Sequence, residues 1–121
     1  MFKEIAWTLF IEAQSKPEAE KVLERFEKAI GSGVECSEFA PYWKDESLFR
    51  VVGVSSLGAQ DVAVALFETL QICYQVCVRW VLTPPQEHEG NKWEFHGSEH
   101  AQTGTRIPGL KLVSFHVDNF D

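Results

Sequence analysis

Residues 5–11 read Ile-Ala-Trp-Thr-Leu-Phe-Ile, and this stretch decides the expected fold. Large apolar side chains occupy every second position, which is the period of a β-strand. The side chains between them, Ala6, Thr8 and Phe10, are also fairly apolar. We therefore expect residues 5–11 to form an interior strand of a β-sheet.

A helix-start signal follows this strand. Ser15 and Glu18 have the spacing of a capping box, and Pro17 suits the first turn of a helix. Apolar residues then recur at helical spacing as far as Ile30, and Gly31 provides a stop. The pattern predicts an amphipathic helix that begins at Ser15 and ends at Ile30.

The middle of the chain repeats the alternation of strands and helix. Residues 34–40 and 48–54 favour two strands joined by a turn at 41–46, which together form a hairpin. A second helix is expected to open at Ser56 or Gly58 and to run through Cys73. Because it carries so few charges, we expect it to be more deeply covered than the first helix. Residues 76–82 predict a buried strand, broken by Pro84-Pro85.

This order of strand, helix, strand, strand, helix, strand predicts an α+β fold. It is the order of the ferredoxin-like split βαβ arrangement (β-α-β-β-α-β), an antiparallel sheet with two helices on one face. Residues 83–121 contain an aromatic stretch, a polar loop at 97–105 and a last strand near 110–117. We expect them to add a C-terminal β extension and to cover part of the open sheet face. With 121 residues, the chain 1–121 is expected to be a single α+β domain.

The charge of the chain narrows its possible partners. There are 18 acidic and 11 basic residues, a formal net charge of −7. An acidic surface disfavours nucleic acid and anionic membranes, and it favours a basic protein partner. No apolar segment reaches the length of a membrane helix, no signal peptide is evident, and the three cysteines are an odd number. These features predict a cytoplasmic protein.

No local motif predicts catalysis, a cofactor or a metal. Four histidines in the C-terminal third (His88, His96, His100 and His116) suggest a metal site, but no Cys-x-x-Cys or His-Glu-x-x-His spacing supports one. Residues 55–58 lack the Gly-x-Ser-x-Gly nucleophile elbow, and no phosphate-binding glycine loop has the required strand and helix around it. We therefore expect no enzymatic activity, no cofactor and no metal.

Two stretches combine acidic and aromatic residues, and they are the candidate partner-binding surface. Aromatic side chains supply anchors that lose water on binding, and carboxylates speed and orient the docking of a basic protein. Alternatively, Trp43 and Trp93 belong to the core or cover a sheet edge, and the acidic residues only keep the protein soluble. The candidate residues are Glu35, Glu38, Tyr42, Trp43, Asp45 and Glu46 in the first stretch, and Glu87, Glu89, Trp93, Glu94 and Glu99 in the second.

In overall character the chain resembles the small acidic immunity proteins of bacterial toxin–immunity systems, such as contact-dependent inhibition and polymorphic toxins. The acidic–aromatic stretches 35–46 and 87–99 on a small α+β frame carry this resemblance, and no sequence motif does. It implies a protein that binds a cognate basic toxin domain, in many cases a nuclease, and occludes its active site or a surface beside it. Because no motif is shared, no functional residue is carried over from the class.

Two other functions remain open from the sequence. One is a ferredoxin-like ligand-binding or regulatory module that acts as a homodimer through an open sheet face containing Trp7, Trp80 and Phe115. The other is a small enzyme of the dimeric α+β-barrel type, with His96 or His116 facing a pocket.

Overall fold

The computed structural model describes residues 1–99 and 104–120. Within these residues the chain forms six strands and two helices, which confirms the α+β class. The elements are β1 (Phe2–Glu12), α1 (Lys16–Ile30), β2 (Glu35–Tyr42), β3 (Asp45–Ala59), α2 (Val62–Val76), β4 (Trp80–His88), β5 (Lys92–Glu99) and β6 (Leu110–Asp118).

The strands form one antiparallel sheet in the order β2-β3-β1-β6-β5-β4. The half formed by β2, β3 and β1 has the order that a split βαβ arrangement requires. In the other half the prediction was wrong, because β6 rather than β4 pairs with β1. The last two strands therefore enter the sheet between β1 and β4 instead of extending its edge.

The composition of β4 explains this exchange. Pro84 and Pro85 have no backbone N–H, so a strand that contains them suits an edge, and the register with β5 shifts between Thr83 and Gln86. In β6, by contrast, Val113, Phe115 and Val117 alternate and are all buried. The strand predicted at 76–82 was accordingly wrong in both position and burial, since α2 continues to Val76 and β4 is largely exposed.

The first helix follows its sequence signals closely. The Ser15 hydroxyl accepts a hydrogen bond from the Glu18 N–H at 3.4 Å, and Gly31 ends the helix with a φ of 73°. The second helix begins later than expected, because β3 continues to Ala59 and Asp61 is the N-cap, accepting from the Val64 N–H at 2.9 Å. No helix in residues 1–99 and 104–120 is long and apolar enough to cross a membrane.

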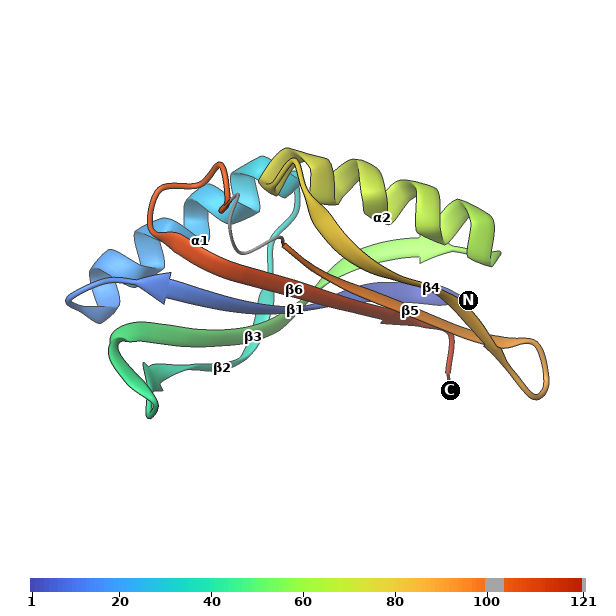
Figure 1. Cartoon of the computed structure of the whole chain (residues 1–121), viewed down its shortest axis with the longest axis horizontal. Helices are drawn as coiled ribbons and strands as arrows, with labels where there is room; N and C mark the ends of the chain where they lie inside the picture. The colour runs from blue at the N-terminus through green and yellow to red at the C-terminus, as the bar shows by residue number, and fades with distance from the viewer. Residues whose placement is uncertain (100–103, 121) are drawn as a thin grey trace.

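Both helices lie on the same face of the sheet, and the core fills the space between them and the strands (Figure 1). Alternate residues of β1 point into this core. Among them, Trp7 packs edge-on against Phe26 with ring centroids 5.0 Å apart, and its Nε1 donates to the Ser55 hydroxyl at 2.8 Å. The intervening residues Thr8 and Phe10 lie half-buried on the opposite, open face.

Two expectations about the faces of the layers were wrong. The aromatic residues assigned to the open sheet face lie on the helix side: Trp7 and Phe115 are buried, and Trp80 Nε1 donates to the carbonyl oxygens of Cys73 and Cys77 at 3.1 and 2.9 Å. In the described part of residues 83–121, β4, β5 and β6 widen the sheet rather than cover its open face.

Candidate partner-binding surface

The first acidic–aromatic stretch forms the hairpin of β2 and β3, and its turn projects Trp43 into solvent. Tyr42 pairs with Asp45, so the turn consists of two residues, Trp43 and Lys44. The Trp43 side chain is 81% exposed. Lys44 Nζ lies 5.0 Å from the centroid of the Trp43 ring, so the indole already holds a cation against its face.

Neighbouring contacts hold this turn in place. The Tyr42 ring packs edge-on against Phe10 of β1, with centroids 4.9 Å apart. Asp45 Oδ1 accepts hydrogen bonds from the Ser47 hydroxyl at 2.6 Å and from the Ser47 N–H at 3.0 Å. These two hydrogen bonds favour the ionised carboxylate and lower the pKa of Asp45 below its ordinary value of 3.8. These contacts hold the residues on both sides of the turn, Tyr42 and Asp45, in place.

A hollow of about 590 Å³ opens beside the hairpin, where the end of β1 meets the start of α1. Three carboxylates, those of Glu12, Glu18 and Glu46, line it, and its described lining residues include no lysine or arginine. Lys111 Nζ approaches Glu12 Oε2 at 3.6 Å from outside the hollow, and both side chains of that pair are more than half exposed. An exposed pair of this kind contributes little energy, so the hollow remains a negatively charged site.

We call the group formed by Tyr42, Trp43, Asp45 and Glu46 with Glu12 and Glu18 the Trp43 corner. Two predicted residues of the same stretch lie outside it. Glu38 pairs with Arg50 across the hairpin, which neutralises its charge locally. Glu35 is the exposed first residue of β2, an eight-residue strand whose other end leads into the turn. Glu12 and Glu18 are far from the hairpin in sequence, and only the meeting of β1, α1 and β3 could have revealed them.

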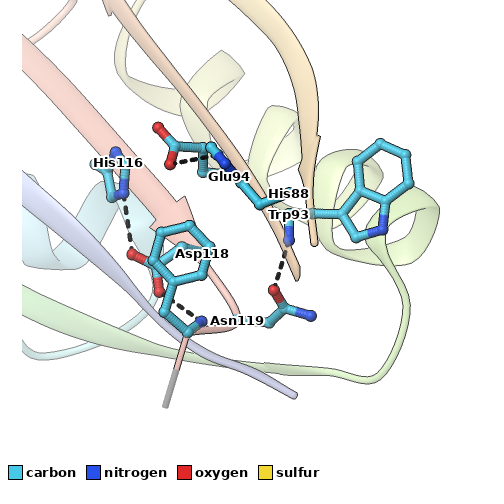
Figure 2. Close-up of polar contacts among 7 residues, drawn as sticks. His88, Trp93, Glu94, His116, Asp118 and Asn119 are labelled. Carbon is cyan, nitrogen blue, oxygen red and sulfur yellow. Dashed lines mark hydrogen bonds and ion pairs between the residues drawn. The ribbon is translucent and has the colours of Figure 1, made fainter. Parts of the chain in front are cut away.

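The second acidic–aromatic stretch has a different character (Figure 2). Glu94 Oε2 lies 2.9 Å from His88 Nε2 across β4 and β5. The Trp93 N–H donates to Asn119 Oδ1 at 2.7 Å, and Trp93 Nε1 donates to Asn91 Oδ1 at 3.1 Å. The indole packs against the hydrophobic core and is only partly exposed. Trp93 thus fits the alternative hypothesis, in which it packs on the core rather than binding a partner. Its hydrogen bond to Asn119 ties the C-terminal segment to β5.

The remaining acidic residues of this stretch divide between surface and interior. Glu87 and Glu89 are exposed at the β4–β5 turn. Glu99 is only 5% exposed, so its assignment to a surface available to a partner was wrong. It follows the parity of Phe95 and Gly97 in β5, which places it on the helix side of the sheet.

The two stretches do not form one surface. Strands β2 and β4 are the opposite edges of the sheet, five strand spacings apart, which corresponds to about 24 Å. Their turns also lie at opposite ends of the strands, because β2 and β5 run in the same direction and the first turn follows β2 while the second precedes β5. Figure 1 shows the two turns at opposite sides of the molecule.

The open sheet face between the two hairpin turns carries both apolar and titratable side chains. The register aligns Ala6 with His116 and His116 with His96, and the two imidazole rings stack with centroids 6.3 Å apart. His116 Nε2 lies 3.0 Å from Asp118 Oδ2, as Figure 2 shows. Among residues 1–99 and 104–120, no three His, Cys, Asp or Glu side chains are grouped so that they could hold a metal ion. His100 lies outside the described residues.

The cysteines show no sign of activation. Cys73 is buried, and burial together with the neighbouring Cys77 raises the pKa of its thiol far above the ordinary value. Partial desolvation and the Glu27 carboxylate raise the pKa of Cys36. The negative charge that acts on Cys36 comes from Glu27 on α1 and not from its sequence neighbours Glu35 and Glu38. The thiols of Cys36 and Cys73 therefore favour the protonated, less nucleophilic form.

Comparisons with known proteins add no family to this description. No protein-family model, no curated protein and no solved structure matches the chain.

Proposed function

We propose that this protein binds a basic protein domain through the Trp43 corner and neutralises it, as immunity proteins do to bacterial toxins, without catalysis of its own. The observation that carries this proposal is an 81% exposed tryptophan at the tip of a hairpin whose strands line, farther back, a hollow with three carboxylates. Tryptophan is enriched among the residues that dominate binding energy at protein interfaces. Carboxylates grouped beside such an anchor suit the guanidinium or ammonium groups of a basic partner.

The distribution of charge supports the same partner. Helix α1 contains four basic and four acidic residues and is neutral overall. The rest of the chain therefore has 7 basic and 14 acidic residues (11 − 4 and 18 − 4), and it carries the whole net charge of −7. An excess of this size attracts a basic domain over long range and raises its association rate. Glu87 and Glu89, at the β4–β5 turn, add to this attraction without contacting the part of the partner that binds the Trp43 corner.

We also propose that the protein is cytoplasmic. We further propose that its fold is a variant of the ferredoxin-like arrangement. In this variant β6 takes the place beside β1 that the fourth strand of a split βαβ unit would occupy. The competing hypothesis, a homodimeric ligand-binding or regulatory module, needed an open sheet face that contains Trp7, Trp80 and Phe115. These residues lie on the helix side of the sheet instead. The binding function keeps its main residues, Trp43 and Glu46, at the surface.

The direct test is to identify the gene immediately upstream and, if it encodes a secreted toxin, to co-express that toxin's C-terminal domain with this protein and score rescue of growth. Wild-type protein should restore growth, and the purified pair should associate at a rate that falls about tenfold or more as salt is raised. Failure to bind or rescue would overturn the proposal. So would tight binding whose association rate ignores salt, because it would remove the role of the carboxylates.

A further inference from the structure

The two edges of the sheet, β4 and β2, differ in their ability to accept a further strand, and in the described part of the chain each pairs with one neighbour only. Pro84 and Pro85 of β4 lack a backbone N–H, so they discourage pairing along that edge. Residues 35–40 of β2 contain no proline, although their register with β3 shifts between Cys36 and Glu38. In an edge strand, alternate N–H and C=O groups point away from the neighbouring strand. The edge of β2 therefore has backbone donors and acceptors available to an added strand.

Helix α1 runs beside this edge, antiparallel to β2. Lys16 Nζ lies 5.5 Å from the centroid of the Phe39 ring, and near the other end of the helix Glu27 Oε2 accepts a hydrogen bond from the Val34 N–H at 2.7 Å. The helix rises about 16–17 Å from Lys16 to Glu27, and an extended chain covers about the same distance from Val34 to Phe39. The two elements therefore lie side by side over this length, and both line a hollow of about 310 Å³.

The side of α1 that faces this hollow is acidic. Three carboxylates at helical spacing line it, and we call them the α1 acidic row: Glu20, Glu24 and Glu27. Lys16 also lines the hollow, at its end nearest the β2–β3 turn, whereas Arg25 turns away and donates to the Pro108 carbonyl oxygen at 3.2 Å. Among residues 1–99 and 104–120, no ion pair involves the α1 acidic row. Although α1 is neutral overall, it presents negative charge to the edge of β2.

We propose that an extended basic segment of a protein partner pairs with the edge of β2 as an added strand and places lysine or arginine side chains against the α1 acidic row. Every second side chain of an extended strand points to the same face, at intervals of about 6.6 Å. Glu20 and Glu24 are separated by about 6 Å along the helix axis. Alternate basic residues of the segment therefore meet successive carboxylates, while its backbone pairs with β2.

This inference rests on the proposed function, because the segment belongs to the same basic partner. The edge leads directly into the turn that carries Trp43, so one partner can contact both. A second copy of this chain does not suit the edge. Pairing of two β2 strands in one continuous sheet would bring the α1 acidic rows of both copies together, and like charges at close range disfavour that contact.

A short peptide that alternates lysine with valine is the probe for strand pairing. It should bind the full chain in titration calorimetry and slow the hydrogen exchange of the β2 amides that point away from β3. Two further peptides, N-methylated at every lysine or at every valine, keep the charge of the first. Because the N–H groups of alternate residues point to opposite edges of a strand, one methylated peptide should bind about tenfold or more weakly than the other. Equal binding by the two methylated peptides would overturn the proposal.

Charge reversal tests the α1 acidic row. The double variant Glu20→Lys with Glu24→Lys should weaken binding of the unmethylated peptide by about tenfold or more, since both side chains are exposed and face the added strand. Glu87→Lys with Glu89→Lys is the matched control, because it makes the same change in net charge at the β4–β5 turn. An equal loss in the control would overturn the proposal, because net charge alone would then explain binding.

Two other results would also contradict the added strand. One is absence of peptide binding to the wild-type chain. The other is a dimer of the chain alone in which the outward β2 amides are already protected, which would assign the edge to a second copy. The proposed function is distinguished from this inference by the growth-rescue experiment, because rescue through the Trp43 corner does not require an added strand.

Discussion

The two acidic hairpins place their tryptophans in opposite roles. Trp43 occupies a two-residue turn, where no strand neighbour covers it, and its indole stands in solvent. Trp93 lies one residue inside β5, on the parity that points to the helix layer, and hydrogen bonds hold both its backbone and its ring nitrogen. Similar composition therefore does not imply similar function, because the position of an aromatic residue relative to the turn decides which face it occupies.

This comparison predicts unequal effects of the two tryptophan substitutions on stability. Trp93→Ala should lower the free energy of unfolding by about 2–3 kcal/mol, because it removes a partly buried aromatic ring from the edge of the core. Trp43→Ala should change it by less than about 0.5 kcal/mol. Urea denaturation of both variants measures the difference. Equal losses would show that the Trp43 ring also belongs to the folded core, and the comparison would fail.

In binding, Trp43→Ala should be the substitution with the large effect. Trp43→Ala should weaken binding of the basic partner by about 2 kcal/mol, or roughly 30-fold, as expected of a central aromatic anchor. Leu112→Ala is the matched control, because Leu112 is an exposed apolar residue on the open sheet face outside the Trp43 corner. Titration calorimetry with the toxin domain gives both affinities. A larger loss in Leu112→Ala would move the binding surface from the corner to the sheet.

The boundary between what the sequence predicts and what it does not follows the range of the interactions. The limits of α1 depend on Ser15, Glu18 and Gly31, which act within one turn of the helix, and they were predicted correctly. The neighbour of β1 depends on pairing across about a hundred residues, and it was not. Local composition predicts a strand at 76–82 and another near 110–117, but the choice between β4 and β6 for the central place rests on the missing donors of Pro84 and Pro85.

The candidate surface shows the same division. The exposure of Trp43 follows from its place in a turn between two strands, which the sequence indicates. Glu12 and Glu18 join the Trp43 corner only because β1 and α1 end beside the hairpin, so no local pattern could have found them. For α2, low charge was interpreted as deep burial. That interpretation was wrong for the outer face of α2, where Phe67 and Tyr74 are exposed, so low charge alone does not indicate burial.

Substitution of Asn119 tests how the hairpin of β4 and β5, which contains Trp93, is held in place. Its side chain accepts from the Trp93 N–H and donates to the Asn91 carbonyl oxygen at 3.3 Å, so it joins the chain after β6 to the β4–β5 turn. Asn119→Ala should lower the free energy of unfolding by about 1 kcal/mol, the net value of a typical hydrogen bond. Faster hydrogen exchange of the Trp93 amide should accompany the loss. An unchanged amide would mean that the Asn119 contact does not hold this hairpin in solution.

The smallest expected effect concerns the turn of the other hairpin and depends on pH. The hydrogen bonds from Ser47 stabilise the ionised Asp45 and lower its pKa in the folded protein below the ordinary value of 3.8. Because the folded-state pKa is the lower one, the stabilisation is present above pH 3.8 and is lost as the pH falls below it, through the folded-state value. Asp45→Asn should therefore melt at a slightly lower temperature than wild type at pH 7, and the difference should disappear at low pH. A difference that stays constant with pH would show that the contact depends on shape rather than charge, and that the base of the Trp43 turn does not use the carboxylate.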